Sequence, residues 1–490
     1  MKLYTEISPT NPAISKAMLS VHGACARAQA DATRPIFHFL PPANWMNDPN
    51  GPIYFNGWYH LFYQHNPYGD GWGFMHWGHA RSQDLVHWEH LPIALWPSME
   101  LGEEHVFSGC ARVDSDGNLL LLYTSVKTRR GESQPPNEQW AASPLDPSAL
   151  TWGKHLANPV LSLETSSGPA FEGDWRDPYI FSAANRTFLV LGANYGNSAS
   201  IPLYEAADGS LMRWNYCGLL YEEERQHGRF LECPNFTYVP ADAEEGSQAK
   251  WILIFSPYKT LEYITGTFDT TTLTFTPDKH GILDSGCGDT PNFYASNVLD
   301  DKNGDCVLLG WIRGFEPDRG WNGCLALPRT LTIGPDGHPR QKPIASLQAI
   351  RGPHVTCATQ VINPGMHVLS CASGDAVEIK IALLLATARA AGLRVRSSYA
   401  GDQGVDIHWT GSALTVAGST VALPESQHRE IELHIFLDKS VLEVFVGGGL
   451  AALTRIINPP EEDLGIYIFA EGSGARMKTF DLWQMNSIWK

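Results

Sequence analysis

A pattern that recurs about every sixty residues constrains the fold of this chain more than any other feature. Its first copy holds Asp48, an aromatic and β-branched stretch, the turn Asn56-Gly57 and a second such stretch. Because Asn-Gly tolerates the positive φ angles of a tight hairpin turn, this copy predicts two antiparallel strands just after Asp48. Four further copies begin near Ser108, Asp177, Glu232 and Asn292, and their turns fall near residues 117, 185, 245 and 304.

Five such units predict a five-bladed β-propeller, in which each repeat forms one four-stranded blade around a common axis. Equivalent positions of successive blades converge on that axis. We therefore expect one pocket to be surrounded by Asp48, Ser108, Asp177, Glu232 and Asn292. The hypothesis that follows is a pocket with three carboxylates, contributed by residues far apart in the sequence.

The chain has 490 residues, which is long for one compact domain, and its pattern changes twice. Asn11 and Pro12, followed by apolar residues at helical spacing, predict a short helix from Pro12 to about Ala28. A Pro- and Gly-rich stretch after the repeats is typical of a boundary, and the strand-like runs beyond it predict a β-sandwich. The predicted all-β organisation is an N-terminal extension at 1–33, the propeller at 34–335, a linker at 336–353 and the sandwich at 354–490.

The composition excludes several classes of partner. The formal net charge of −17 argues against binding to nucleic acid or to an anionic membrane surface. No run of eighteen apolar residues and no apolar N-terminal region occurs, so we expect no membrane span and a leaderless, cytoplasmic chain. The alternative is a secreted protein whose signal peptide has been removed. Nine Cys without a CxxC pair indicate reduced, buried thiols rather than a disulfide framework, and the oligomeric state stays open.

The carboxylates predict cleavage of a glycosidic bond. One carboxylate can attack the anomeric carbon while a second, protonated carboxyl group donates its proton to the leaving oxygen. Asn47 and Asn50 flank Asp48 and can keep it ionised through hydrogen bonds. Less polar neighbours favour the protonated form of Glu232, namely Leu231, Cys233 and Pro234. We therefore predict Asp48 as the nucleophile and Glu232 as the general acid and base.

Asp177 has a different predicted role. It follows Arg176, whose positive charge should keep the carboxylate ionised. Its expected task is to hold substrate hydroxyls and to stabilise the positive charge that develops on the sugar. Two pairs of His, at 76 and 79 and at 87 and 90, lie in predicted strands and loops, where this spacing does not bring both rings together. No metal site is therefore predicted.

Several sequence blocks carry a family resemblance. Three of them, 45–51 (Trp-Met-Asn-Asp-Pro-Asn-Gly), 176–178 (Arg-Asp-Pro) and 232–233 (Glu-Cys), resemble the signature blocks of glycoside hydrolase family 32. This is the family of invertases, inulinases and levanases, which are β-fructofuranosidases. Further blocks agree in the same order, at 62–67, 76–80, 107–109, 292–295, 327–329 and 442–445. The resemblance extends from about Arg34 to the end of the chain.

This resemblance implies a five-bladed propeller with an appended sandwich, a double-displacement mechanism that retains configuration, and no metal or organic cofactor. It implies the same roles for Asp48, Asp177 and Glu232 as the repeats do. It also implies that the fructosyl subsite is lined by Asn47, Gln64, Trp72, Phe107, Ser108, Arg176 and Trp311, with Cys233 tuning Glu232. Trp321 competes with Trp311 for one aromatic position. The chain departs from the family at Asn292, where an acidic residue is expected.

The predicted function is that of a retaining, exo-acting β-fructofuranosidase that releases fructose from sucrose and short fructo-oligosaccharides. A fructosyltransferase and a sucrose-6-phosphate hydrolase of the same fold are alternatives. The second would need a basic cluster beside the pocket, for which the candidates are Lys127, Arg129 and Arg130. From another class, a non-catalytic sugar-binding propeller is disfavoured because Asp48 and Glu232 are both intact.

Overall fold

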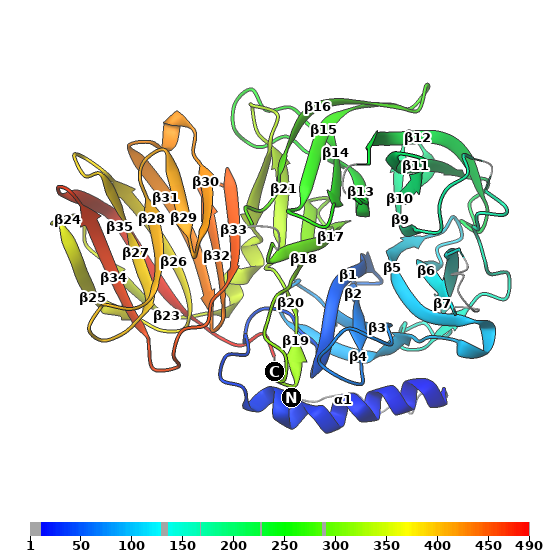
Figure 1. The fold of residues 1–490 in the computed structure, drawn as a ribbon, viewed down its shortest axis with the longest axis horizontal. Helices are drawn as coiled ribbons and strands as arrows, with labels where there is room; N and C mark the ends of the chain where they lie inside the picture. Colours follow the sequence, from blue (N-terminus) through cyan, green and yellow to red (C-terminus); the bar gives the residue numbers. More distant parts are fainter. Residues whose placement is uncertain (1–10, 129–135, 167, 226–227, 287–290, 490) are drawn as a thin grey trace.

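The computed structural model describes residues 11–128, 136–166, 168–225, 228–286 and 291–489, and most of its regular structure is β. Five sheets surround one axis as a propeller, and two further sheets pack face to face as a sandwich (Figure 1). This arrangement confirms the predicted fold of a five-bladed propeller followed by a β-sandwich. Within the described ranges, no helix is long and apolar enough to cross a membrane.

Each blade is an antiparallel sheet whose first strand lies nearest the axis. The first blade contains β1 (Asn44–Phe55), β2 (Trp58–Asn66), β3 (His76–Ser82) and β4 (Trp88–Leu95). The second contains β5 (Glu103–Val113), β6 (Leu119–Lys127), β7 (Glu138–Pro144) and β8 (Trp152–Lys154). The third contains β9 (Trp175–Ala183), β10 (Arg186–Tyr195), β11 (Ser198–Ala206) and β12 (Trp214–Glu224). The fourth contains β13 (Glu232–Val239), β14 (Lys250–Ser256), β15 (Glu262–Asp269) and β16 (Thr274–Ile282).

The fifth blade closes the ring. It contains β17 (Phe293–Asp300), β18 (Cys306–Ile312), β21 (Arg329–Ile333) and β22 (Pro339–Pro343), with β20 (Cys324–Leu325) paired to β18. Between β18 and β21 the chain also forms β19 (Trp321–Asn322), which pairs in parallel with β1 of the first blade. The predicted linker 336–353 therefore differs from the structure, because it contains β22 as well as a 3-10 helix, η2 (Ala345–Ile350). The other 3-10 helices are η1 (Met99–Leu101) and η3 (Glu425–Gln427).

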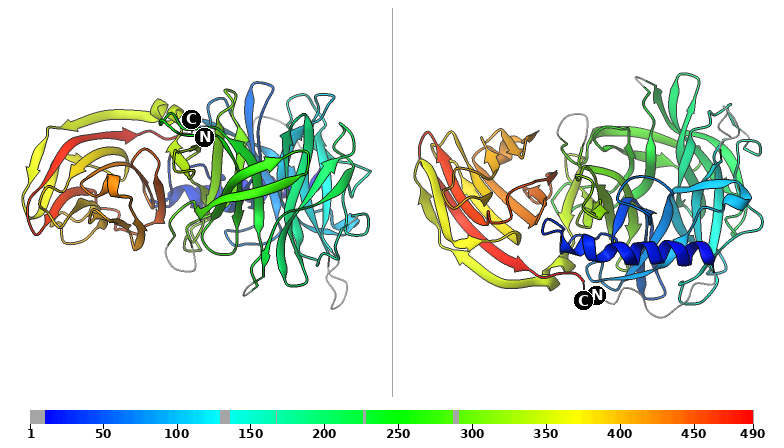
Figure 2. Two further views of the ribbon diagram at one scale, coloured as in Figure 1. Left: turned by 90° about the horizontal axis from the view of Figure 1, so that it is seen from above. Right: turned by 60° about the horizontal axis from the view of Figure 1, so that its bottom comes forward.

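Helix α1 (Pro12–Ala30) crosses the outside of the first blade (Figure 2). Asn11 caps it, accepting hydrogen bonds from the backbone N–H groups of Ala13 and Ile14, and Pro12 occupies the first turn. Its buried residues at helical spacing include Ile14 and Ala17, which pack against Ile93 of β4. The predicted helix is thus confirmed, with its end two residues later than expected.

Two sheets of the sandwich enclose a second apolar core. One has the strand order β23, β35, β26, β31, β32, β33, with β24 paired to β35, and the other has the order β25, β34, β27, β28, β29, β30. Their bounds are β23 (Arg351–Cys357), β24 (Gln360–Ile362), β25 (Gly365–Ser373), β26 (Ala376–Leu384), β27 (Ala390–Ser397), β28 (Val405–Trp409), β29 (Ala413–Val416), β30 (Ser419–Ala422), β31 (Glu430–Asp438), β32 (Val441–Val446), β33 (Ala451–Ile456), β34 (Gly465–Glu471) and β35 (Ala475–Met485).

One disulfide corrects the prediction that all cysteines are reduced. Cys357 at the end of β23 is bonded to Cys371 in β25, so the bond joins the two sheets of the sandwich. No spacing motif marks this pair, because the bond depends on strands of opposite sheets meeting at one end. Of the other cysteines, Cys287 lies outside the described residues, and the remaining six are free.

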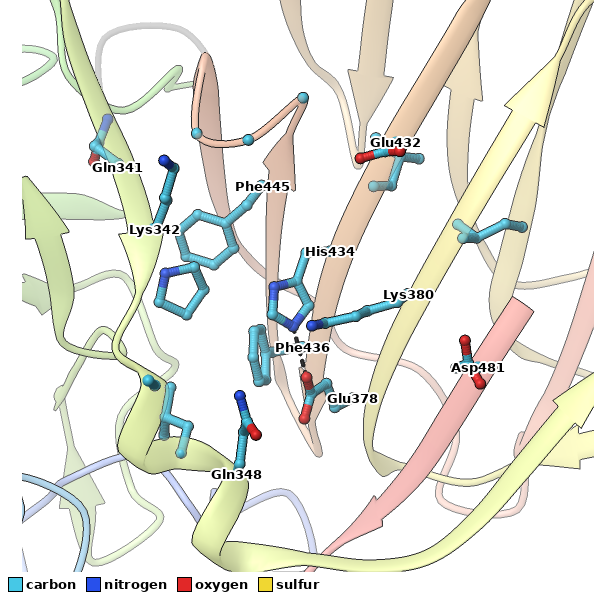
Figure 3. A pocket seen from close by; sticks show the side chains of 18 of the residues that line it. Gln341, Lys342, Gln348, Glu378, Lys380, Glu432, His434, Phe436, Phe445 and Asp481 are labelled. Atoms are coloured by element: carbon cyan, nitrogen blue, oxygen red, sulfur yellow. Dashed lines mark hydrogen bonds and ion pairs between the residues drawn. The ribbon is translucent and has the colours of Figure 1, made fainter. Parts of the chain in front are cut away.

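A cleft of about 490 Å³ separates the outer strand of the fifth blade from the sandwich (Figure 3). Lys342 and Gln348 lie on its propeller side, and Glu378, Lys380 and His434 lie on its sandwich side. None of the three predicted catalytic carboxylates lines this cleft. The predicted site is therefore separate from the hollow between the domains.

A buried ionic network holds the two domains together. The carboxylate of Asp438 accepts hydrogen bonds from three consecutive backbone N–H groups at residues 36–38 and lies 2.8 Å from Nδ1 of His38. Nε2 of the same ring lies 3.0 Å from Glu443, which also binds the guanidinium of Arg329. Arg329 further contacts Asp284, and all five side chains are almost completely buried. Removing one partner would leave an uncompensated charge in the interior, so the contact between the domains is specific.

The network makes folding stability depend on pH. Burial opposes the charge of His38, but Asp438 and Glu443 outweigh it and raise the pKa of the imidazole to about 9. Since the folded pKa lies above the unfolded value, this stabilisation is complete below about pH 6.5 and is lost as the pH rises through 9. It amounts to at most about 3 kcal/mol. We expect the midpoint of thermal unfolding to fall by several degrees between pH 6.5 and pH 9.5, as measured by calorimetry.

The His38→Gln variant is the control for this prediction. Its midpoint should be lower at pH 6.5 and should change less over the same interval, because glutamine does not titrate. An equal decrease in both proteins would show that other groups cause the pH dependence.

Candidate active site

A β-bulge interrupts the innermost strand of every blade at an equivalent place. Each bulge leaves two residues of that strand opposite one residue of the next, which bends the strand and redirects the side chains. The bulged pairs are Asn47-Asp48, Phe107-Ser108, Asp177-Pro178, Cys233-Pro234 and Ala295-Ser296. The sixty-residue pattern thus reflects a repeated irregularity that brings side chains of several blades together.

Asp48 accepts hydrogen bonds from three donors. Ser108 Oγ donates to Oδ2 at 2.5 Å, and Asn47 Nδ2 donates to Oδ1 at 3.0 Å. Cys233 Sγ lies 3.4 Å from Oδ2. The donors come from the first, second and fourth blades, so the carboxylate is fixed by strands distant in sequence. This arrangement suits a carboxylate that must keep one orientation toward a reacting atom.

Arg176 joins the carboxylates of two blades. Its Nη2 donates to Glu232 Oε1 at 3.0 Å, and its Nε lies 3.7 Å from Asp177 Oδ2. Nη1 donates to Asp174 at 2.6 Å, and the guanidinium plane stacks 4.0 Å from the ring centroid of Phe230. Arg176 is only 7% exposed, so these contacts are made in a largely water-excluded space.

The surroundings of Glu232 are more polar than predicted. Besides Arg176, the phenol of Tyr294 donates to Glu232 Oε2 at 2.8 Å. Both oxygens of the carboxylate are therefore bound by polar groups, although its sequence neighbours are apolar. The expectation of a less polar environment for Glu232 is wrong, because Arg176 of the third blade and Tyr294 of the fifth blade surround its carboxylate with polar groups.

Cys233 connects the two aspartates. Its backbone N–H donates to Asp177 Oδ2 at 3.1 Å, and its Sγ lies 3.7 Å from the same oxygen as well as 3.4 Å from Asp48. Because Glu232 precedes Cys233 directly, the three predicted catalytic carboxylates are brought into one cluster. Burial and the charges of Asp177, Asp48 and Glu232 raise the pKa of the Cys233 thiol well above its usual value, so it stays protonated and can donate.

The cluster raises the pKa of both aspartates. Burial and then the charge of Glu232 raise the pKa of Asp48, and the bonds from Ser108, Asn47 and Cys233 only partly oppose this. Burial raises the pKa of Asp177 to about 7; Arg176 opposes the shift, while Glu232 and Asp48 add to it. Arg176 thus favours the ionised form of Asp177, as predicted, but its effect is smaller than that of burial. Desolvation and like charges outweigh the neighbouring cation.

The predicted binding residues lie around this cluster. Gln64 is buried and donates from Nε2 to the backbone oxygen of Val106 at 2.9 Å, next to the second bulge. Trp72 is 57% exposed and packs edge to face on Phe107, with the two ring centroids 6.2 Å apart. Phe107 is half-buried, so Trp72 is the exposed ring of an aromatic pair that can stack on the carbon face of a sugar.

Trp311 and Trp321 are clearly distinguished. Trp311 packs in a small cluster with Trp45, Tyr294, Ala295 and Cys233, beside the carboxylates. Trp321 is fully buried, and its indole N–H donates to Asp31 after helix α1. The preference for Trp311 is consistent with this arrangement, and Trp321 serves closure of the propeller.

Asn50 and Asn292 differ from expectation. Asn50 Oδ1 accepts from the backbone N–H of Gly109 at 3.2 Å, so of the two flanking asparagines only Asn47 bonds to Asp48. Asn292 Nδ2 donates to the backbone oxygen of Arg313 at 2.9 Å, and its Oδ1 accepts from Ile456 of the sandwich at 3.3 Å. Ala295, not Asn292, occupies the bulge of the fifth blade, because the pattern there is shifted by three residues.

Sequence reasoning missed Tyr258, Tyr294 and Phe230 as parts of the site. Arg176 Nη2 donates to the phenol oxygen of Tyr258 at 2.7 Å. The backbone N–H of Tyr258 donates to the phenol oxygen of Tyr294. Tyr294 belongs to a block noted in the sequence, but nothing local indicates that its partner is Glu232. Among the residues that the structure describes, no three His, Cys, Asp or Glu side chains are placed to hold a metal ion.

Two family models match the chain. "Glycosyl hydrolases family 32 N-terminal domain" matches residues 38–343, and "Glycosyl hydrolases family 32 C terminal" matches residues 346–484. The first match covers every strand of the propeller, from β1 to the end of β22 at residue 343. The second covers nearly all of the sandwich.

Similar proteins agree with these matches. A levanase of Bacillus subtilis (strain 168) is 31% identical over 93% of this chain and 71% of its own length. A sucrose-6-phosphate hydrolase of Escherichia coli is 30% identical over 92% of this chain and 94% of its own length. A solved structure of fructan 1-exohydrolase IIa from Cichorium intybus, in complex with 1-kestose, superposes with a TM-score of 0.82 at 22% identity. It covers 93% of this chain and 98% of the other, and it supports the fold alone.

Proposed function

The chain belongs to glycoside hydrolase family 32, and from this membership and the geometry of its carboxylates we propose that it is a retaining β-fructofuranosidase that hydrolyses sucrose. Enzyme class and family rest on the family models and on relatives named for hydrolysis of fructosides. The single observation that supports the mechanism is the joining of Asp48, Asp177 and Glu232 through Cys233 and Arg176. Such a cluster can act on both sides of one glycosidic carbon.

In the proposed first step, Asp48 attacks the anomeric carbon of the fructosyl unit. The bond from that carbon to the bridging oxygen breaks, and Glu232, protonated, transfers its proton to that oxygen, which leaves as glucose. The product is a covalent fructosyl ester on Asp48. In the second step Glu232 takes a proton from water, the water oxygen bonds to the anomeric carbon, and Asp48 leaves as a carboxylate.

The surrounding groups support these roles. Ser108, Asn47 and Cys233 hold the Asp48 carboxylate in one orientation, which favours attack along a fixed line. Asp177 has a pKa of about 7, so near neutrality it can either donate a hydrogen bond to a sugar hydroxyl or accept one. We assign it to the positioning of fructosyl hydroxyls and to stabilisation of the developing positive charge.

The proposed substrate is sucrose, together with short fructo-oligosaccharides. The exposed ring of Trp72, packed on the half-buried Phe107, offers an aromatic face for the fructosyl unit. Hydrolysis of sucrose 6-phosphate is the second candidate, favoured by the names of full-length relatives. Of its expected basic cluster, Arg129 and Arg130 lie outside the described residues, and Lys127 is paired with Glu138 at 2.8 Å. Transfer of fructose to a second sugar would use the same covalent intermediate.

We expect Asp48→Asn and Glu232→Gln to abolish most sucrose hydrolysis while the protein stays folded. Loss of proton transfer by Glu232 should lower kcat by about 10²- to 10⁴-fold, and loss of the nucleophile should cost at least as much. Glucose release measures activity, and circular dichroism measures folding. Asp269→Asn, an exposed turn residue of the fourth blade, is the matched control and should keep wild-type turnover. Near-normal activity in either site variant would refute its assigned role.

Retention of configuration should be visible when methanol competes with water. The fructosyl ester on Asp48 should then give methyl β-D-fructofuranoside, because two displacements restore the original configuration. Proton NMR of the first products identifies the anomer of the methyl glycoside. Formation of the α-anomer would instead indicate a single displacement and would contradict the nucleophilic role of Asp48.

A comparison of substrates separates the candidates. We expect kcat/KM for sucrose to equal or exceed that for sucrose 6-phosphate, because Lys127 is already engaged with Glu138. The same assay with 1-kestose, inulin and levan reports the preferred chain length. A clear preference for sucrose 6-phosphate would overturn the proposed substrate and support the second candidate, and accumulation of longer fructosides would indicate transfer.

A further inference from the structure

The backbone around Arg176 adopts a conformation that needs support. Asp177 lies in the bulge of β9 with φ of 66°, in the left-handed region that only a few per cent of non-glycine residues adopt, aspartate more often than most. Such residues persist only where their surroundings hold them in place, and they concentrate at functional sites. The groups that hold Asp177 therefore also hold its carboxylate and the adjoining guanidinium.

Two buried side chains of the second blade provide this support. Thr124 Oγ1 in β6 accepts a hydrogen bond from the backbone N–H of Asp177 at 2.9 Å. The same hydroxyl donates to Gln139 Oε1 in β7 at 2.8 Å, and Gln139 Nε2 donates to the backbone oxygen of Trp175 at 3.0 Å. Thr124 and Gln139 are both completely buried. The pair thus binds the main chain on each side of Arg176.

The direction of this hydrogen-bond chain is determined by its ends. The N–H of Asp177 can only donate, so the Thr124 hydroxyl accepts and its own hydrogen must go to Gln139. The Gln139 oxygen is then used as the acceptor, and its NH₂ group remains to meet the carbonyl of Trp175. The backbone of Gln139 is itself held on both sides, by bonds with Leu161 and Val160. Each donor and each acceptor in this chain of hydrogen bonds has one assigned partner, which makes the arrangement rigid.

We propose that Thr124 and Gln139 are positioning residues, which set the places of Arg176 and Asp177 relative to Glu232 and Asp48. They touch none of the reacting atoms and act through the main chain of the third blade. The inference rests on the proposed function only in that Asp177 and Arg176 serve the reaction. A displacement of these two groups by a fraction of an ångström would weaken the hydrogen bonds made to the transition state.

A second hydrogen bond from a bulge N–H to a hydroxyl of the preceding blade shows what is particular to Thr124 and Gln139. In the fifth blade Ala295 also lies in a bulge with positive φ, and its N–H donates to Ser256 Oγ of the fourth blade at 3.1 Å. A hydroxyl of the preceding blade thus holds a left-handed bulge residue in both places. Only at Asp177, where the bulge carries a carboxylate next to a buried cation, is the hydroxyl tied to a glutamine that binds the other side.

The test compares Thr124→Val with Thr124→Ser. Valine keeps the shape but removes the hydroxyl, and we expect kcat to fall about ten- to a hundredfold. Serine keeps the hydroxyl and should restore kcat to within about threefold of wild type. The assay uses the fructoside that the wild-type enzyme hydrolyses fastest, so failure with sucrose alone bears on the proposed substrate and not on this inference.

Thr265→Val is the matched control. Thr265 in β15 is also completely buried, and its hydroxyl donates to the backbone oxygen of Gly337 at 3.0 Å, away from the carboxylates. Its loss should lower the unfolding midpoint about as much as Thr124→Val does, with kcat unchanged. If the two valine variants show equal kcat, the proposed positioning role is overturned.

Gln139→Met provides an independent route if Thr124→Val does not fold. It should lower kcat by a similar factor. Where both single variants fold, the double variant Thr124→Val/Gln139→Met should lose no more than the larger single effect, because both residues act in one chain of bonds. Multiplying losses, or a Gln139→Met enzyme with wild-type kcat, would show that the two residues do not act as one unit and would overturn the proposal.

Discussion

The site depends on one buried cation among several carboxylates. Arg176 contacts Glu232, Asp177 and Asp174, and it lies against the face of Phe230. Carboxylates gathered in a space with little water repel one another, and without a cation they would take up protons instead of staying ionised. The positive charge therefore permits the cluster to exist. Burial, and then the remaining excess of negative charge, raise the pKa of Asp48 and Asp177.

Placement of this cation requires the whole ring of blades. Each inner strand contributes its part through a bulge, and the bulge positions are held by hydrogen bonds from neighbouring blades, such as those of Gln64 and Thr124. β19 joins the last blade to the first, and the network around His38 and Arg329 attaches the sandwich to the same ring. The sandwich thus stabilises the scaffold, while Asp48, Asp177 and Glu232 all belong to the propeller.

Much of this arrangement was predictable because hairpin turns and apolar strands leave a local signal. The five blades, helix α1 and the positions of Asp48, Asp177 and Glu232 followed from that signal and from the family resemblance. Features that depend on contacts between distant strands could not be predicted in this way. Neither the partner of Tyr294 nor the disulfide of Cys357 has a local signature, and the shift from Asn292 to Ala295 arises from strand register. The high pKa of Asp177 depends on burial, which its neighbour Arg176 cannot reveal.

Closure of the propeller also has a consequence for the order in which a growing chain can reach its native state. The edge of β1 near Asn44 finds its partner only at Trp321, so the strand that carries Asp48 stays incompletely paired until the fifth blade has been synthesised. Near the other end, Trp489 stacks on His90 of the first blade at 4.5 Å. Blades can fold one after another on the ribosome. Completion of the ring, however, must wait until translation has passed β22, which ends at residue 343.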